Sequence, residues 1–160
     1  QVLIAIALFL SFFIMQPTLT EVYNVALSPF LSETLPADQA IMEASSVMKD
    51  FMVANTRSDT LLMFSDMAGA DGYESNADIP FSTLLPSFIT SELKTAFQIG
   101  FLLFLPFLVI DMVIASILMA LGMMMLSPML VSLPFKLLLF VLVDGWAMTV
   151  GSLAATFLTP

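Results

Sequence analysis

Residues 101–126 read FLLFLPFLVIDMVIASILMALGMMML, an apolar stretch with a single charged residue, Asp111. From Thr95 to Pro160 there are two more charges, Lys136 and Asp144. A charge in hydrocarbon costs about 2.5–3.5 kcal/mol on insertion scales, so such residues persist where they pair or face protein. The stretch predicts membrane-type helices built for assembly, and it ends in a flexible apolar cluster of Gly122 and three methionines.

Composition supports a membrane class and excludes several functions. The chain is 59% hydrophobic and 11% charged, against about 25% charged in soluble domains. It contains no His and no Cys, which removes imidazole and thiolate chemistry, so we expect neither an enzyme nor a bound cofactor or metal. With four basic residues and a net charge of −9, nucleic acid and anionic headgroups are poor partners.

Residues 1–16 predict the C-terminal part of an apolar membrane-type helix. The run from Val2 to Met15 is shorter than the ~20 residues that a helix needs to cross hydrocarbon. We expect residues upstream of Gln1 to be removed or not represented, and Pro17 to end the helix at Gln16. A signal-peptide core is the alternative, but no A-x-A cleavage site follows.

Residues 17–86 predict an acidic, mainly helical region. Thr18 and Glu21 fit a capping box for a helix to about Leu31, and an apolar stripe at helical spacing follows Pro36. Ser58-Asp59 resembles the N-cap of another helix, which Gly69 would end in the left-handed conformation, before a mobile loop at 69–82.

The charge of this region indicates its side of the membrane. It holds ten acidic residues against Lys49 and Arg57. Segments poor in Lys and Arg are the ones translocated, which favours the periplasmic side. The acidity suits either an ordinary solvated surface or a vestibule that steers basic cargo.

Residues 87–160 predict an αα hairpin with the methionines at its tip. Ser87–Leu126 reads as one helix of roughly 60 Å, about twice the hydrocarbon thickness. It must therefore break at Gly100 and Pro106 or pack outside hydrocarbon. A turn bracketed by Ser127-Pro128 and Leu133-Pro134 should precede a second helix over 135–158, with Gly122 as a further hinge.

One face of the second helix carries a charged end and a small end. Residues at steps of three or four lie on it: Lys136, Phe140, Asp144, Ala147, Gly151 and Ala155. The last three form a small-xxx-small run, which lets helices approach closely, so we predict a helix-packing face there.

Lys136 needs a partner, and Asp111 is the natural candidate. In a straight hairpin that turns at Leu126, their depths would differ by roughly 15 Å or more. This favours a charged pair between neighbouring subunits. The alternative is that Lys136 snorkels to an interface while Asp111 is protonated.

Several ordered motifs resemble the FliP family, the flagellar members of the FliP/SctR proteins of type III secretion export gates. They are PSFITSELKTAFQIG at 86–100, ID at 110–111, ALGMMM at 120–125, LPFK at 133–136 and VDGW at 143–146. The resemblance covers essentially the whole chain.

The resemblance implies an all-α membrane protein of long kinked helices, with a C-terminal αα hairpin and a small helical outer-side region, assembled into a helical ring. Five copies would join FliQ and FliR, and an FlhB-like subunit, in the bacterial inner membrane at the flagellar basal body, largely on the periplasmic side. Unfolded flagellar subunits would pass through its channel. Met123, Met124 and Met125 would form the pore gasket, and Asp111 and Lys136 the charged pair.

Rival functions come from other classes. Thioethers suit copper(I), but three consecutive helical residues point about 100° apart and converge on one ion only if several subunits contribute. A non-conducting structural scaffold is a second alternative. An intramembrane aspartyl protease fits least, because Asp111 and Asp144 are the two acids and no supporting motif accompanies them.

Overall fold

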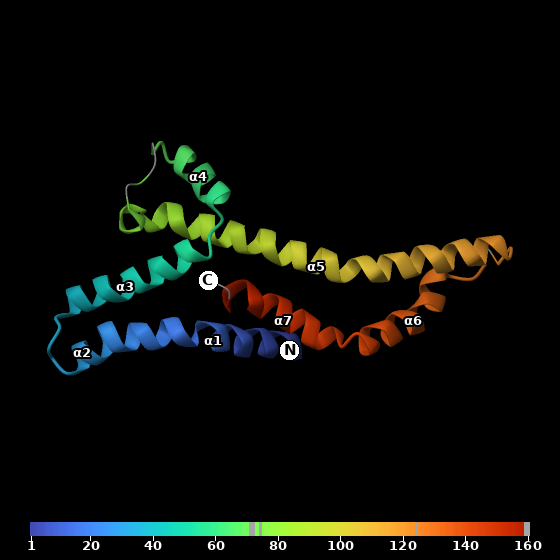
Figure 1. Cartoon of the computed structure of the whole chain (residues 1–160), viewed down its shortest axis with the longest axis horizontal. Helices are drawn as coiled ribbons and strands as arrows, with labels where there is room; N and C mark the ends of the chain where they lie inside the picture. The colour runs from blue at the N-terminus through green and yellow to red at the C-terminus, as the bar shows by residue number, and fades with distance from the viewer. Residues whose placement is uncertain (71–72, 74, 124, 159–160) are drawn as a thin grey trace. The chain divides into compact units, whose positions relative to one another are not determined.

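The computed structural model describes residues 1–70, 73, 75–123 and 125–158, and within these residues all regular structure is helical. The predicted all-α class is therefore confirmed for the described chain. In order, the elements are α1 (Val2–Val22), the π-helical η1 (Tyr23–Leu27), α2 (Ser28–Leu31), α3 (Ala37–Ala54), α4 (Ser58–Met67), the 3₁₀ turn η2 (Asn76–Asp78), α5 (Phe81–Ala120), α6 (Pro128–Leu142) and α7 (Gly145–Leu158) (Figure 1).

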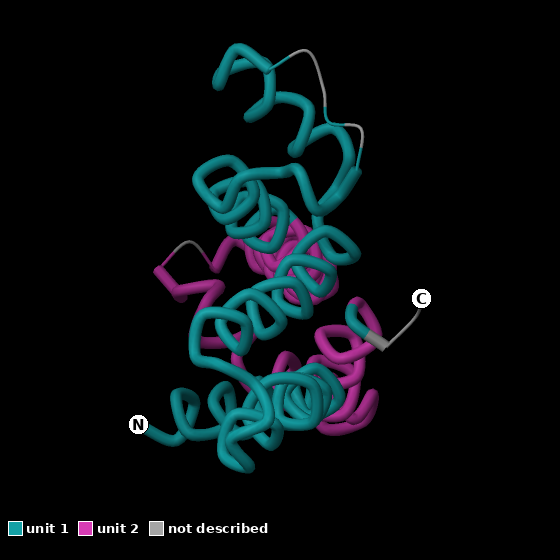
Figure 2. Tube along the Cα trace, turned by 90° about the vertical axis from the view of Figure 1, so that its left-hand side faces the viewer, with its two compact units in different colours: residues 1–94, 157–160 teal, residues 95–156 magenta. Residues whose placement is uncertain are grey.

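The chain forms two compact units (Figure 2). Unit 1 comprises residues 1–94 and 157–160, and unit 2 comprises residues 95–156. The boundary falls inside α5, so the first turns of that helix belong to unit 1 and the remainder to unit 2. These units differ from the three-part division that composition suggests.

Pro17 does not end the first helix. It lies inside α1, and the helical path continues through η1 and α2 to Leu31, the end predicted from the sequence. The predicted stop at Gln16 and the capping box at Thr18 are therefore wrong. In an apolar segment without water, the backbone gains by keeping every remaining hydrogen bond, so one bond lost to proline does not end the helix.

Helices α3 and α4 lie where the sequence predicts them, but the predicted N-cap at Ser58-Asp59 is wrong. Helix α3 follows Pro36 directly. Helix α4 begins at Ser58, although Arg57 occupies the N-cap and no side chain caps it. Gly69 has a φ of 71° and donates its N–H to the carbonyl of Asp66. This is the left-handed helix end that glycine favours.

The expected loop at 69–82 is only partly a loop. Residues 71, 72 and 74 lie outside the described residues. The turn η2 and the start of α5 at Phe81 occupy its second half. A small core lies beneath it, in which Met52, Ile79 and Leu84 are buried.

Helix α5 is a single element of 40 residues. It begins six residues before the predicted start and ends six residues before the predicted end, Leu126. It runs without interruption through Gly100 and Pro106, so the alternative of a break at these positions is wrong, whereas a kink at Pro106 stays a prediction. At 1.5 Å per residue it is about 60 Å long.

The predicted second helix is divided. Helix α6 begins at Pro128 and carries Pro134 inside it, so the predicted turn at Leu133-Pro134 is wrong. Helix α7 begins at Gly145, and the two helices are bent by 60°. Lys136 and Ala155 therefore do not share one continuous helical face. The cause is Asp144, whose φ of 51° cannot continue an α-helix.

Two helical segments are long and apolar enough to cross a membrane, judged by length and composition. They are Val2–Leu31, with a mean hydropathy of 2.2, and Phe81–Ala120, with a mean hydropathy of 2.6. The bent pair of α6 and α7 makes a third if it counts as one span. Large apolar side chains make up much of the exposed surface of these helices. Exposed apolar surface of this extent is typical of a site covered by lipid or by other protein.

Candidate functional site

A charged cluster joins α5 to α6 within unit 2. Lys136 Nζ donates to Asp111 Oδ2 at 2.6 Å, and Ser132 Oγ donates to Asp111 Oδ1 at 2.5 Å. The side chains of Lys136 and Asp111 are 21% and 33% exposed, and Ser132 is fully buried. Both carboxylate oxygens of Asp111 therefore accept hydrogen bonds from side chains on one face of α6.

This pairing within one chain differs from the expected pairing between subunits. The expectation placed the turn at Leu126, whereas α5 ends at Ala120. Asp111 lies nine residues before that end, and Lys136 lies eight residues after the start of α6 at Pro128. At 1.5 Å per residue the two depths are about 13 and 12 Å, so the side chains meet.

Sequence reasoning missed Ser132 as the third member. Ser132 precedes Lys136 by four residues, so both lie on the same face of α6. The sequence did contain a signal for it, because Ser132 stands one helical turn before the lysine on an otherwise apolar helix. Its hydroxyl also lies 3.0 Å from the carbonyl oxygen of Met129, the ordinary back-bond of a helical serine.

The segment after α5 turns sharply at Gly122. This glycine has a φ of 72°, and its N–H bonds to the carbonyl of Met119. The N–H of Met123 bonds to the carbonyl of Leu118, which completes a Schellman helix end. Gly122 is thus a turn residue, and its role as a hinge stays a prediction.

The predicted gasket residues follow this turn. Met125 is wholly exposed, at 101%, and Met123 is 37% exposed. Both lie in the irregular segment between α5 and α6; the side chain of Met125 is free of packing within the chain, whereas that of Met123 is partly covered. Met124 lies outside the described residues.

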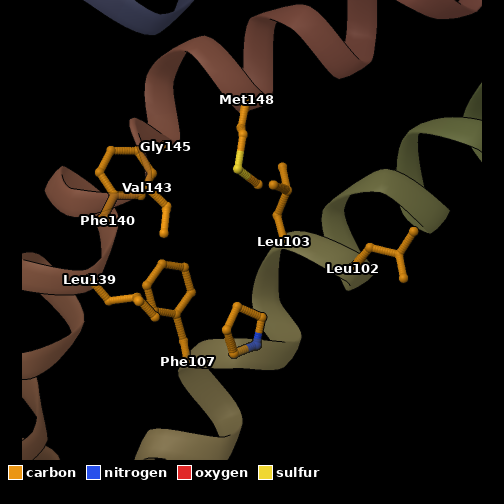
Figure 3. A pocket seen from close by; sticks show the side chains of 9 residues that line it. Leu102, Leu103, Phe107, Leu139, Phe140, Val143, Gly145 and Met148 are labelled. Atoms are coloured by element: carbon orange, nitrogen blue, oxygen red, sulfur yellow. The ribbon is translucent and has the colours of Figure 1, made fainter.

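An aromatic cluster covers the joint between α6 and α7. The ring of Phe140 packs edge-on against Trp146 at 5.6 Å and lies 6.4 Å from the ring of Phe107 on α5. Figure 3 shows the Phe140 ring directly beside Gly145. An apolar cavity of about 150 Å³ adjoins the cluster, and Pro106, one of the predicted hinge residues, lines it.

Comparison with known proteins identifies the lineage of this chain. A sequence profile of the FliP family matches residues 1–153. The chain belongs to the FliP family. Three similar relatives, each named flagellar biosynthetic protein FliP, come from Cereibacter sphaeroides, Buchnera aphidicola and Bacillus subtilis. They are 74%, 55% and 54% identical over 98–99% of this chain.

This FliP-family chain spans only part of the length of these curated relatives. It covers 52% of the Cereibacter protein, 42% of the Buchnera protein and 71% of the Bacillus protein. What the whole protein binds and conducts is therefore treated below as a proposal.

The small-residue face predicted for this FliP-family chain lies on α7. Ala147, Gly151 and Ala155 are each exposed and lie four residues apart. A Cβ added at Gly151 would meet no atom within 4 Å. At Gly151 this face is therefore open within the described chain.

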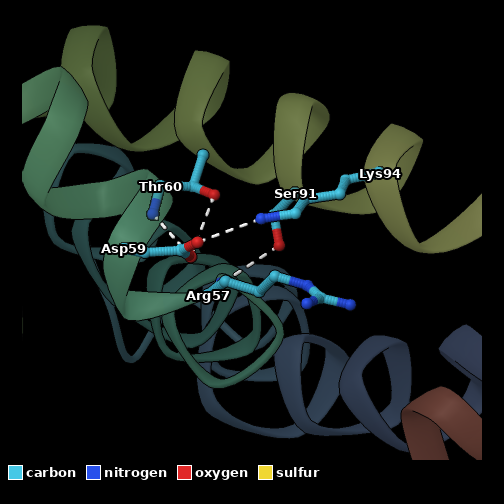
Figure 4. Close-up of polar contacts among 5 residues, drawn as sticks. All are labelled: Arg57, Asp59, Thr60, Ser91 and Lys94. Atoms are coloured by element: carbon cyan, nitrogen blue, oxygen red, sulfur yellow. Dashed lines mark hydrogen bonds and ion pairs between the residues drawn. The ribbon is translucent and has the colours of Figure 1, made fainter.

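A second polar cluster ties α4 to the start of α5 in unit 1 (Figure 4). Lys94 Nζ donates to Asp59 Oδ2 at 3.0 Å, and the backbone N–H of Arg57 donates to Ser91 Oγ at 3.0 Å. The hydrogen bond from Lys94 is the main cause that lowers the pKa of Asp59; burial opposes it, and the N–H of Thr60 adds to the lowering. Sequence reasoning did not single out this cluster. Among the described residues, no group of three or more acidic side chains is placed to hold a metal ion.

Proposed function

We propose that this chain is the pore-forming core subunit of the flagellar type III protein export gate. In this proposal, five copies surround a channel in the bacterial inner membrane, together with FliQ and FliR. Unfolded flagellar export substrates cross the membrane through it, and an FlhB-like subunit and the larger export apparatus deliver them. Membership of the FliP family supports the flagellar role.

The observation that carries the gate proposal is the exposed methionine segment after α5. Met125 contacts almost nothing within its own chain and follows a glycine-built helix end that fixes where the segment begins. Exposed thioethers on an irregular segment are free to pack on copies from neighbouring subunits. Because methionine is unbranched and polarizable, such a ring could exclude water and then repack around passing chains.

The charged cluster suits the base of a hairpin that presents this segment. Asp111 receives hydrogen bonds from Ser132 and Lys136, which hold α5 and α6 together about 13 Å from the turn. In the proposed hairpin, the cluster limits sideways movement of the two arms, while the exposed side chain of Met125 is free to repack.

The exposed apolar surface supports assembly. The small-residue face of α7 and the apolar sides of α5 and α6 are uncovered in the single chain. In the proposed ring, neighbouring subunits, FliQ, FliR and lipid cover them. The acidic residues of unit 1 fit the periplasmic side, because translocated segments are poor in Lys and Arg.

The mass of the detergent-solubilised complex tests the assembly. The full-length protein, expressed with its small membrane partners, should elute as a complex of several copies with those partners bound. Native mass spectrometry gives the mass of the complex and the number of copies of each subunit. A monomer that co-purifies with no partner would contradict the proposal.

A further inference from the structure

The apolar cavity of unit 2 continues into a longer groove. The cavity of about 150 Å³ is lined by side chains of α5, α6 and α7. A second apolar hollow, of about 470 Å³, lies between α5 and α6. Leu139 lines both hollows, so they are neighbours. Together they form the apolar track, which follows α5 from Leu102 to Ile117 and the facing side of α6 and α7 from Phe135 to Met148.

The cavity end of the track is kept open by the backbone. Gly145 lines the cavity without a side chain, and the bend of 60° at Asp144 turns α7 away from the line of α6. Pro106 lines the cavity from α5, and Figure 3 shows the side chains of the three helices arranged around the space. An empty apolar cavity lowers stability in proportion to its volume, so an apolar group that can enter it is favoured.

The lining of the track selects hydrocarbon. Each residue that lines it is apolar, and the neighbouring charges of Asp111 and Lys136 pair with each other. A buried water needs about two to four hydrogen-bonding partners, which apolar side chains do not offer. A polar ligand would lose its hydrogen bonds to water without replacement. The occupant is therefore apolar along its whole length.

The length and the width of the track distinguish an acyl chain from a partner helix. From Leu102 to Ile117, α5 advances about 22 Å, and one leaflet of hydrocarbon is about 15 Å thick, half of the bilayer core. A helix with its side chains is about 10–12 Å wide, whereas a cavity of about 150 Å³ takes a group the size of benzene. A helix could lie along the groove but could not enter the cavity. An acyl chain can do both.

From these observations we infer that the apolar track binds one acyl chain of a membrane phospholipid, with the methyl end of the chain in the cavity beside Gly145. The track lies on a helix that is long and apolar enough to cross a membrane, so lipid chains can reach it. From residue 95 to residue 160 the one basic residue is Lys136, which is paired, so the track selects the chain and not the headgroup. The inference rests on the apolar character of unit 2 and not on the proposed export function.

Photolabelling in vesicles tests the inference. The full-length protein, assembled with its partners, is placed in phosphatidylcholine vesicles in which a small fraction of the lipid carries a diazirine at the methyl end of one chain. Mass spectrometry then locates the adducts. A bound chain should label the half-buried Leu103 and Phe107 more strongly than Val141, which is 75% exposed and lies outside the track. Contact with bulk lipid would follow exposure instead.

A matched pair of variants ties the labelling to the cavity. Val143 lines the cavity, whereas Val141 lines neither part of the track. Val143→Phe should fill the cavity and abolish the labelling of Leu103. Val141→Phe makes the same change at an exposed position of the same helix and should leave the labelling of Leu103 unchanged.

Three results would overturn the inference. The first is labelling that follows exposure in the wild-type protein, with Val141 labelled more strongly than Leu103 and Phe107. The second is equal labelling of Leu103 in the wild type and in Val143→Phe; if that variant does not assemble, the wild-type pattern decides alone. The third is labelling of the isolated protein that is lost in the assembled complex, which would show that a partner subunit fills the track.

Discussion

At the residue scale, Asp111 matters because both of its oxygens are occupied by α6. Its partners Ser132 and Lys136 lie one turn apart, so a shift of α6 along α5 breaks both hydrogen bonds together. The pair is partly exposed, so it is weaker than a fully buried pair. It is nevertheless less screened than the surface pair of Lys94 and Asp59, whose side chains are 47% and 65% exposed.

Removing one partner of this pair should destabilise the protein measurably. We expect Lys136→Ala or Asp111→Ala to lower stability, though by less than the ~3–5 kcal/mol typical of fully buried pairs. Exchanging the two charges should cost less than either single change. Thermal unfolding in detergent and native gels of the assembly measure the effects.

The matched control is Lys94→Ala, which removes an exposed pair and should cost less than about 1 kcal/mol. Equal stability of the single variants and the charge-exchanged variant would show that Asp111 and Lys136 act independently.

Asp59 should make a small, pH-dependent contribution to the stability of unit 1. Its lowered pKa means that the folded state favours the carboxylate, chiefly through the hydrogen bond from Lys94. The contribution is present above the unfolded pKa of about 3.9 and is lost as pH falls through the lower folded pKa. The gap in unfolding midpoint between wild type and Asp59→Asn should therefore close below about pH 4. A gap that stays constant down to pH 3 would argue against this effect.

At the element scale, the glycines divide by backbone conformation. Gly122 has a positive φ and Gly100 lies inside α5 with an ordinary helical conformation. Gly122→Ala should destabilise by about 1–2 kcal/mol, whereas Gly100→Ala should stabilise by about 0.5–1 kcal/mol. Chemical unfolding of both variants followed by circular dichroism tests the contrast. If Gly122→Ala is neutral, the Schellman end of α5 is not what sets the turn.

The small-residue face of α7 should matter for assembly rather than for folding. Gly151→Leu adds a bulky side chain where the chain leaves open space, so the subunit should fold normally. If Ala147, Gly151 and Ala155 pack against a neighbour, the complex should dissociate more readily on native gels. Full assembly of this variant would place the face against lipid.

Helices such as α3 and α4 could be predicted because their apolar spacing and glycine end agree with tertiary packing. The errors have a common origin in the membrane-type segments. Pro17 and Pro134 looked like helix ends, but apolar surroundings favour continued backbone bonding around a proline. Asp144 was placed inside a helix by its spacing, although Asp144-Gly145 is a dipeptide typical of turns, and this local signal outweighed the helical periodicity.

The candidate site shows the same limit. Asp111, Lys136 and Gly122 could be named from residue type and spacing, whereas the pairing of the charges within one chain depended on where α5 ends. Because α5 ends six residues earlier than predicted, Lys136 of the same chain pairs with Asp111, and the inferred pairing between subunits was wrong. Ser132 became visible only when the two helices were placed side by side.

At the scale of the whole molecule, the described chain buries little of its apolar surface by itself. Large side chains are exposed along α1, α5, α6 and α7. Exposed apolar surface of this extent is unfavourable in water, which is consistent with a membrane environment. In the proposed ring, the exposed methionines of several subunits would meet around the channel.

Ion leakage through the assembled complex tests the proposed gasket most directly. Met123→Ala, Met124→Ala and Met125→Ala together remove apolar volume without adding charge, so the complex should still assemble. Leucine at the same three positions is the control, because it keeps the volume but is branched and stiffer. We predict that the alanine variant leaks small ions in proteoliposomes while the leucine variant remains closer to wild type. An alanine variant that assembles fully and shows no rise in ion permeability would contradict the gasket.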